Sequence, residues 1–247
     1  MSARQRVAQQ PAWVLHTLPW RETSLIVEIF ARDFGRLALA AKGARRPMSE
    51  MRGILMSFQP LLLDWTGGGE VKTLIRGEWR GGQPLLTGRA LLCAYYLNEL
   101  LLKLTAREDP HPPLFDAYET AITALAKGES LPPLLRRFEF ALLRELGYGL
   151  TLDTDSGGQP IRPGETYLYL PEHNPCRRAA EMDQERAHAT AEGVPVDGQT
   201  LLDLAADDFS RATTLNEARR LLRMLIDHHL GGQPLQSRRV LEELREL

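Results

Sequence analysis

Residues 23–47, TSLIVEIFARDFGRLALAAKGARRP, contain two apolar runs separated by Asp-Phe-Gly. Alternation over such short runs is typical of β-strands with one buried face, and Asp-Phe-Gly supplies residue types of a tight turn. The second run ends in a loop with three cations around a glycine, which are Lys42, Arg45 and Arg46. The stretch therefore predicts an antiparallel hairpin that leads into a basic loop.

The first 80 residues continue this pattern of short runs bounded by turn formers. A second turn signal, TGGGE at 66–70, precedes the last run, and a short helix is expected between the third and fourth runs. The expected strands span residues 13–18, 23–31, 36–42, 58–65 and 71–79. Three strands, a short helix and two strands is the order of the OB-fold, a small barrel that often binds oligonucleotides.

The pattern changes at GGQP, residues 81–84, beyond which apolar residues recur at helical spacing. The expected helices span residues 85–107, 114–126, 133–146, 199–209, 215–230 and 237–247. Residues 150–177 read as a loop or hairpin excursion. We therefore predict an α+β fold, with an N-terminal five-stranded OB-fold β-barrel at residues 1–80 and a mainly α-helical C-terminal domain at residues 81–247.

The composition is that of a globular protein, since 43% of the 247 residues are hydrophobic and 25% are charged. No uncharged apolar run approaches the roughly 18 residues of a membrane span, and the N-terminus lacks the apolar core of a signal peptide. We expect a cytoplasmic protein with no membrane association. The only two cysteines, Cys93 and Cys176, exclude a disulfide framework.

The net charge of -2 hides an asymmetry between the two predicted domains. Residues 1–80 contain 12 Lys and Arg and 7 Asp and Glu, a net charge of +5. Residues 81–247 contain 18 and 25, a net charge of -7. A basic module joined to an acidic one favours a polyanion as the ligand of the first.

The sequence contains no nucleophile elbow, Walker loop, dinucleotide fingerprint or paired-carboxylate motif. His228 and His229 are adjacent, and on a helix they point about 100° apart, so they do not face one ion. His173 and Cys176 lie close in a loop, but no second pair of soft ligands accompanies them. We therefore expect a protein that is not an enzyme and that holds no metal or cofactor.

Cations beside the proposed barrel predict a nucleic-acid surface. Gly43 lets the backbone turn sharply, and Trp20 beside Arg21 offers a ring on which a base stacks, although packing also accounts for a tryptophan there. The candidate DNA-binding residues are Trp20, Arg21, Arg36, Lys42, Arg45, Arg46, Arg52, Lys72 and Arg76. Because such a barrel binds either polymer, an OB-fold RNA-binding adaptor is the alternative.

The expected helix at 133–146 carries a second pattern of interest. Arg136, Phe140 and Leu143 share one side, and arginines lie on the adjoining face. An apolar strip flanked by guanidinium groups fits an acidic protein segment with an aromatic residue. Ordinary helix packing with solvated arginines explains the same pattern.

Eight segments, taken in order, resemble the bacterial recombination mediator family RecO along nearly the whole chain. They are WVLHTLPWRETSLIVEIFARDFGRL, AAKGARRPMS, GILMSFQPLLLDW, GEVKTL, YYLNELLLKL, LFDAYE, LRRFEFALLRELGYGL and LGGQPLQSRRVL. The resemblance implies a DNA repair and recombination mediator without catalytic turnover, which binds single- and double-stranded DNA and anneals complementary strands. It also implies docking on the acidic tail of single-stranded DNA-binding protein (SSB), work with RecR and possibly RecF to load RecA, and a place at the nucleoid.

The resemblance also assigns roles to segments. The AKGARRP loop matches the family's basic segment beside the barrel. LRRFE matches the region to which the SSB tail is attributed, so the candidate tail-binding residues are Arg136, Arg137, Phe140 and Leu143. Many relatives carry a four-cysteine zinc module after GYGL, whereas this chain reads TLDTDSGGQPI there and keeps only Cys176. We expect that the zinc is gone and that packing holds this loop.

Overall fold

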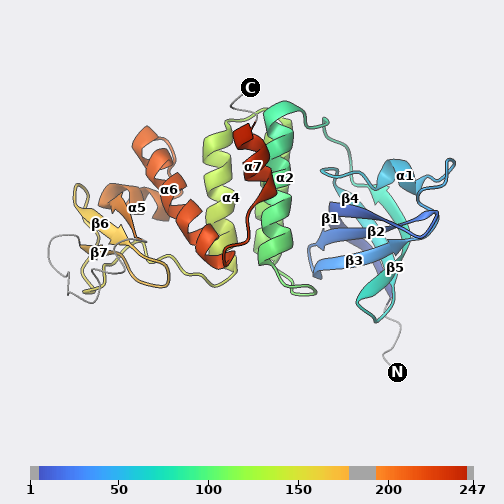
Figure 1. The fold of residues 1–247 in the computed structure, drawn as a ribbon, viewed down its shortest axis with the longest axis horizontal. Coiled ribbons are helices and arrows are strands. Elements are labelled where there is room, and N and C mark those ends of the chain that lie inside the picture. The colour runs from blue at the N-terminus through green and yellow to red at the C-terminus, as the bar shows by residue number, and fades with distance from the viewer. Residues whose placement is uncertain (1–5, 178–192, 244–247) are drawn as a thin grey trace. The chain divides into compact units, whose positions relative to one another are not determined.

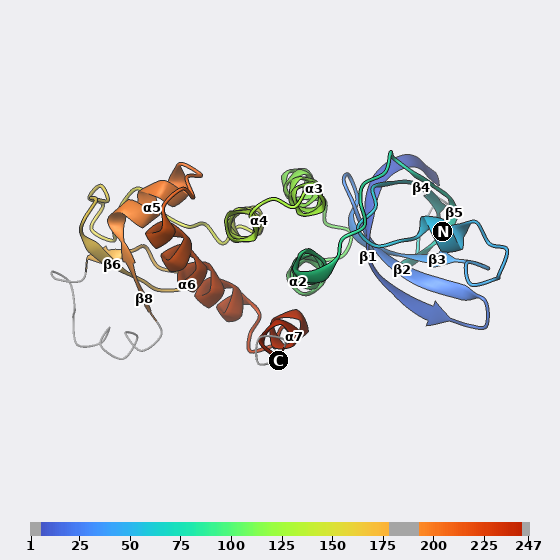
Figure 2. The same ribbon diagram turned by 90° about the horizontal axis from the view of Figure 1, so that it is seen from above.

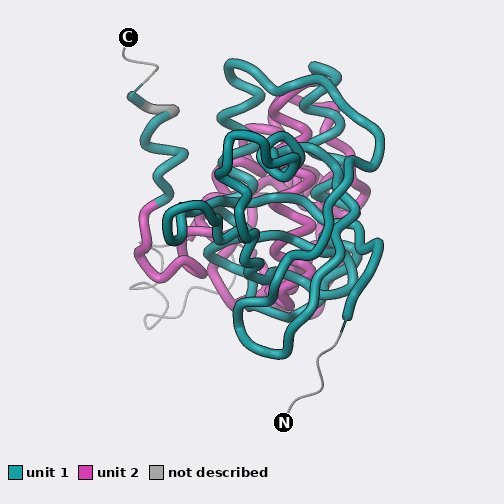
Figure 3. The backbone as a smooth tube through the Cα atoms, turned by 90° about the vertical axis from the view of Figure 1, so that its right-hand side faces the viewer, with its two compact units in different colours: residues 1–129, 235–247 teal, residues 130–234 magenta. Residues whose placement is uncertain are grey.

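The computed structural model of the chain describes residues 6–177 and 193–243. The chain divides into two compact units, shown in teal and magenta in Figure 3. Unit 1 is Met1–Glu129 with Leu235–Leu247, and unit 2 is Ser130–Pro234. The predicted domains at 1–80 and 81–247 therefore do not coincide with these units, because the first helices after the barrel belong with the barrel.

Unit 1 begins with a closed barrel of five strands in the order β1-β2-β3-β5-β4 (Figure 1). Its elements are β1 (Arg6–Trp20), β2 (Ser24–Ala31), β3 (Gly35–Ala41), the short helix α1 (Met51–Ile54), β4 (Leu61–Thr66) and β5 (Val71–Trp79). β3 and β5 pair in parallel, and every other neighbouring pair is antiparallel. The predicted OB-fold is confirmed, with both predicted turns in place.

The first strand begins seven residues earlier than the sequence predicted. Its early part pairs with β4, from Arg6 opposite Thr66 to Ala12 opposite Leu61, and its later part pairs with β2. A bulge interrupts the register between Val7 and Gln10. Two glutamines and a proline there hide the alternation, because a bulge breaks the two-residue period on which that prediction depends.

The alternating residues of the hairpin fill the barrel. Val27 and Ile29 of β2 and Leu37 and Leu39 of β3 are buried together with residues of the other strands. Burying each such side chain contributes about 1.5–3 kcal/mol to the free energy of unfolding. The DFG turn also depends on the close approach of another segment, since a Cβ added to Gly35 would lie 2.1 Å from the carbonyl oxygen of Asp109.

Three helices complete unit 1: α2 (Gly88–Leu104), α3 (Pro112–Ala126) and α7 (Gln236–Glu243). Figure 2 shows α2 and α3 end-on beside the barrel. The Asn98 side chain donates a hydrogen bond to the carbonyl of Leu15 in β1 (2.8 Å) and accepts one from the Tyr118 hydroxyl (2.5 Å). This buried polar chain ties both helices to the first strand. The last residues of the expected final helix, 244–247, lie outside the described residues.

The described residues of unit 2 form three helices and a small three-stranded sheet. Its elements are α4 (Leu131–Glu145), β6 (Thr166–Tyr169), β7 (Cys176–Arg177), β8 (Val194–Asp197), α5 (Gly198–Ala205) and α6 (Ala212–His229). The sheet has the order β7-β6-β8. β6 and β7 pair as an antiparallel hairpin within residues 150–177, which the sequence read as a loop or hairpin excursion. β8 adds a third strand that the sequence did not predict. β8 is only four residues long and contains a proline, which weakens its strand signal.

Hydrogen bonds as well as packing hold the loop that follows GYGL, for which the absence of zinc stays a prediction. Asp155 is buried, and its carboxylate accepts hydrogen bonds from the backbone N–H groups of Gly157 (3.0 Å) and Gln159 (2.8 Å). The side chains of Leu152 and Ile161 are buried beside it in the chain. A carboxylate that accepts two backbone hydrogen bonds in this way orders the turn.

Candidate nucleic-acid interface

Two turns meet at one end of the barrel. The backbone N–H of Arg45 donates to the carbonyl of Thr23 (2.9 Å), and its guanidinium lies within 3.5 Å of the carbonyls of Arg21 and Glu22. In Figure 1 both turns lie at the end of the barrel away from α2. We call residues 20–23 and 42–52 the basic end of the barrel.

The loop of the basic end is a series of hydrogen-bonded turns. Gly43 has a φ of 70°, which a glycine adopts readily, and its carbonyl accepts from the N–H of Arg46 (3.0 Å). Ala44 is fully buried in the barrel core and anchors the loop. The carbonyl of Arg46 in turn accepts from the N–H of Ser49 (3.0 Å). The buried anchor and these turns leave the long side chains of the loop facing solvent.

Cations outnumber carboxylates at the basic end. The exposed cations are Arg21, Lys42, Arg45, Arg46 and Arg52. Two carboxylates, Glu22 and Glu50, lie in the same segments. Within residues 6–177 and 193–243, none of the five cations forms an ion pair with a carboxylate. A cluster of unpaired cations creates a positive potential that attracts phosphate groups.

Trp20 and Arg21 form a cation–π pair at this end. The indole is partly exposed, and the guanidinium carbon of Arg21 lies 4.3 Å from the ring centroid. Arg21 reaches this position because its backbone is left-handed, with a φ of 52°. Both the guanidinium plane and the indole are surfaces on which an unpaired base stacks. Contacts of Arg45 with the 20–23 turn thus bring Trp20 and Arg21 close to the loop that carries Lys42, Arg45 and Arg46, and Arg52 lies further along that segment, on α1.

Arg36 and Lys72 face a different part of unit 1. Arg36 donates to the carbonyl of Thr105 (2.9 Å) and pairs with Glu28 (3.6 Å), and burial lowers the pKa of its guanidinium. Lys72 is buried, bonded to the carbonyl of Gly69 and paired with Glu108. Both cations therefore contact the segment that follows α2, through Thr105 and Glu108. We correct the candidate set by removing them, because neither cation is accessible to a phosphate.

Arg76 lies on β5, where it is exposed and paired with Glu78 (2.6 Å). The structure gives it a carboxylate partner of its own, unlike the cations of the basic end. We therefore leave Arg76 out of the interface as well.

The candidate tail-binding residues on α4 do not form one open strip. Leu143 is fully buried, and Arg136 is buried and paired with Glu139 (2.5 Å). Phe140 is partly exposed. Arg137 is exposed, and its Nε lies 3.2 and 3.0 Å from the two carboxylate oxygens of Asp207. Packing therefore accounts for Leu143 and Arg136, and only Arg137 and Phe140 remain accessible to a partner.

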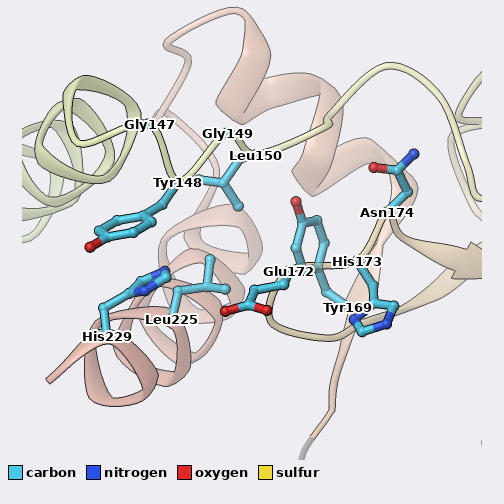
Figure 4. Close-up of a pocket in the computed structure, with 10 residues that line it drawn as sticks. All are labelled: Gly147, Tyr148, Gly149, Leu150, Tyr169, Glu172, His173, Asn174, Leu225 and His229. Atoms are coloured by element: carbon cyan, nitrogen blue, oxygen red, sulfur yellow. The ribbon is translucent and has the colours of Figure 1, made fainter. Parts of the chain in front are cut away.

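A hollow of about 390 Å³ in unit 2 was not predicted (Figure 4). The ring of Tyr148 stacks on that of His229, with 13° between the planes, and His228 lies 3.2 Å from the carboxylate of Glu172. Burial, together with the neighbouring His228, lowers the pKa of His229. Tyr148 is the tyrosine of the GYGL segment, but no sequence spacing relates it to His229.

The predicted absence of a metal site stays a prediction. Among the residues that the structure describes, no group of three or more His, Cys, Asp or Glu side chains is placed to hold an ion. His228 contacts Glu172 and His229 stacks on Tyr148, while their two rings meet edge to face with centroids 5.2 Å apart. His173 contacts the carbonyl of Pro171 (2.7 Å).

A closed five-stranded OB-type barrel with a cation-rich end, joined to a helical region, defines a protein of the oligonucleotide-binding-fold class. The family model "Recombination protein O N terminal" matches residues 4–82, and "Recombination protein O C terminal" matches residues 85–239. The chain belongs to the RecO family, a family of DNA repair and recombination proteins.

Curated relatives are similar over the full length. The chain is 64% identical to a protein of Aromatoleum aromaticum and 63% identical to one of Azoarcus sp., in each case over 100% of both chains. It is 52% identical to a protein of Dechloromonas aromatica, again over 100% of both. All three are named DNA repair protein RecO. Within the described part of this chain, no helix is long and apolar enough to cross a membrane.

Proposed function

We propose that this protein binds single- and double-stranded DNA at the basic end of its barrel and anneals complementary strands during repair. One observation carries the proposal. The cations of unit 1 that face its helices are paired with carboxylates, as Arg36 is with Glu28 and Arg32 with Asp116. The five exposed cations of the basic end have no carboxylate partner among the described residues. Charge left unpaired on one surface suits an external polyanion.

The mechanism is electrostatic and independent of sequence. Cations that replace the condensed counterions of DNA gain affinity, and this gain falls as salt rises. The Trp20 and Arg21 pair adds a surface on which a base of a single strand stacks. Two strands held through their phosphates repel each other less and still exchange register, because such contacts do not read bases. These two properties are what strand annealing requires.

In this proposal, the surface that binds protein partners lies on unit 2. The SSB tail docks at Arg137 and Phe140 of α4, the accessible pair of the four candidates. In cooperation with RecR, and with RecF where it is present, the protein helps load RecA on single strands in the cytoplasm, at the nucleoid. No catalytic step or cofactor is part of this role.

Annealing of SSB-coated strands tests the proposal. The chain should accelerate pairing of complementary DNA strands covered with SSB, measured by quenching between end labels. The same assay with complementary RNA strands addresses the RNA-binding alternative. Acceleration of RNA pairing alone, with no effect on DNA, would overturn the proposal in favour of an RNA adaptor.

A further inference from the structure

We propose that Met48 is a wedge that inserts beside an unstacked base when DNA binds at the basic end. This inference rests on the proposed DNA binding and adds one residue with a distinct role. Met48 is 93% exposed, and the next most exposed large apolar side chain among the described residues, Leu85, is 65% exposed. A side chain in this position contributes almost nothing to the core, so packing does not account for an apolar residue there.

The chain presents Met48 on a built turn. Pro47 and Met48 are the two central residues of the turn closed by the Ser49 N–H on the Arg46 carbonyl (3.0 Å), and proline favours the first of these positions. The turn continues into α1, since the carbonyl of Ser49 accepts from the N–H of Arg52 (3.1 Å). Hydrogen bonds on both sides therefore hold Met48 at the tip, which lowers the entropy lost when it inserts into a ligand.

Charge around the turn favours DNA as its occupant. Arg45 and Arg46 precede Met48, and Arg52 follows it at the start of the short helix. These cations are exposed and suited to phosphates on either side of a base step, which would place the apolar tip at the level of the bases. Proteins that insert apolar side chains between bases use methionine among others, because its unbranched thioether is polarizable and fits an irregular gap.

The wedge separates stacked bases, which contacts to phosphate groups do not do. Cations alone hold a strand without changing its stacking, whereas an inserted side chain separates neighbouring bases and exposes them to a second strand. Insertion into a duplex would open a base step in the same way. Met48 would thus link affinity for the backbone to access to the bases.

Fluorescence of 2-aminopurine tests this role, because the emission of this base analogue rises when it unstacks. A duplex oligonucleotide with one central 2-aminopurine is saturated with the wild-type protein or with Met48→Ala, Met48→Gln or Met48→Leu. We expect the wild type to raise the emission, Met48→Leu to retain most of the rise, and Met48→Ala and Met48→Gln to reduce it about threefold or more. DNA affinity should fall by about fivefold or less in all three variants, since phosphate contacts dominate it.

Ile75→Ala is the matched control, because Ile75 is also an exposed apolar residue of the barrel (48%) and lies outside the basic end. It should leave the emission rise unchanged. Tight DNA binding by Met48→Ala with an undiminished rise would overturn the wedge and leave the proposed function standing. Absence of DNA binding by the wild type would overturn both. Loss of binding to anionic lipid vesicles in Met48→Ala, with unchanged emission on DNA, would assign Met48 to a membrane surface instead.

Discussion

The carboxylate of Glu99 in α2 accepts hydrogen bonds from both the backbone N–H (2.9 Å) and the hydroxyl (2.6 Å) of Ser237, 138 residues later in the chain. It also accepts from the N–H of Gln236 (2.8 Å). These N–H groups belong to the first turn of α7, where they have no partner within the helix. A side chain of α2 therefore anchors the last described helix of the chain to unit 1.

Stability of this anchor should depend on pH. Burial raises the pKa of Glu99, but the hydrogen bonds from Ser237, Gln236 and Lys103 outweigh burial and lower it from the ordinary value of 4.5. A carboxylate with a lowered folded-state pKa stabilises the fold above its unfolded-state pKa and loses that contribution as pH falls. We expect the thermal midpoint of the wild type to exceed that of Glu99→Gln at pH 7 and to approach it as pH falls from about 5 to 3. A constant difference across this range would contradict the anchor.

Gly35 should be intolerant of a side chain for two reasons. Its φ of 65° is strained for other residues, and an added Cβ would meet the backbone of Asp109. Gly81→Ala is the matched control, because Gly81 has a φ of 80° but open space around it. We expect Gly81→Ala to cost about 1 kcal/mol in the free energy of unfolding and Gly35→Ala at least about 2 kcal/mol more, as measured by urea denaturation. Equal costs would show that the Asp109 segment moves freely.

Much of the barrel was predictable because its signals are local. In β2 and β3 the residues that fill the barrel, such as Val27, Ile29 and Leu39, alternate along the chain and show a two-residue period. The opposite face, expected to be exposed, is buried as well, since Phe30 packs against Phe115 and Tyr118 of α3. Glu99 makes one contact that local sequence spacing predicts and others that it does not. Its pairing with Lys103 (3.3 Å) is of the kind that i,i+4 spacing on a helix predicts. Its hydrogen bonds to α7 join residues more than a hundred positions apart in the sequence, and no periodicity in the sequence predicts them.

The candidate site was predictable to a similar extent. The clustering of Arg45 and Arg46 follows directly from their adjacency in a loop. Arg36 and Lys72 were wrongly included, because strand alternation does not say whether a face meets solvent or another element. The contact between Arg45 and the Thr23 carbonyl, which joins the two turns, depends on barrel closure and has no local signal.

Charge reversal at the basic end should weaken DNA binding and flatten its salt dependence. On single strands each phosphate contact contributes about -0.7 to the slope of log affinity against log salt, so Arg45→Glu with Arg46→Glu should reduce the slope by about 1.4. Fluorescence anisotropy with labelled oligonucleotides of several sequences measures both quantities. The reduction should be similar for every sequence, because these contacts go to the backbone.

Arg89→Glu serves as the control for charge reversal, because Arg89 is exposed in unit 1 but lies on α2 rather than at the basic end. It should change affinity and slope little. Unchanged affinity in the double variant would exclude the loop from the interface, and an equal loss in Arg89→Glu would show a general effect of net charge.

Asp207 should compete with an acidic ligand for Arg137. Its carboxylate lies at 3.0–3.2 Å from Nε of Arg137, whose guanidinium is also 5.3 Å from the centroid of the Phe209 ring. A tail peptide with an acidic stretch and a terminal aromatic residue has to displace this carboxylate. We expect Arg137→Ala to weaken peptide binding about tenfold, because charge-assisted hydrogen bonds contribute about 1.5–3 kcal/mol each. Asp207→Asn should strengthen binding, because a neutral amide competes less well for the guanidinium.

Stability changes should be small in both variants, since the Arg137 and Asp207 side chains are 51% and 64% exposed and such pairs contribute about 0–1 kcal/mol. Anisotropy with a labelled peptide gives the affinity, and a labelled single-stranded oligonucleotide is the control ligand. Affinity for the oligonucleotide should stay constant, because the interface proposed for DNA lies in the barrel. Unaltered peptide affinity in both variants would place the docking site elsewhere, whereas opposite shifts in the two variants would identify Asp207 as the internal competitor of the acidic tail.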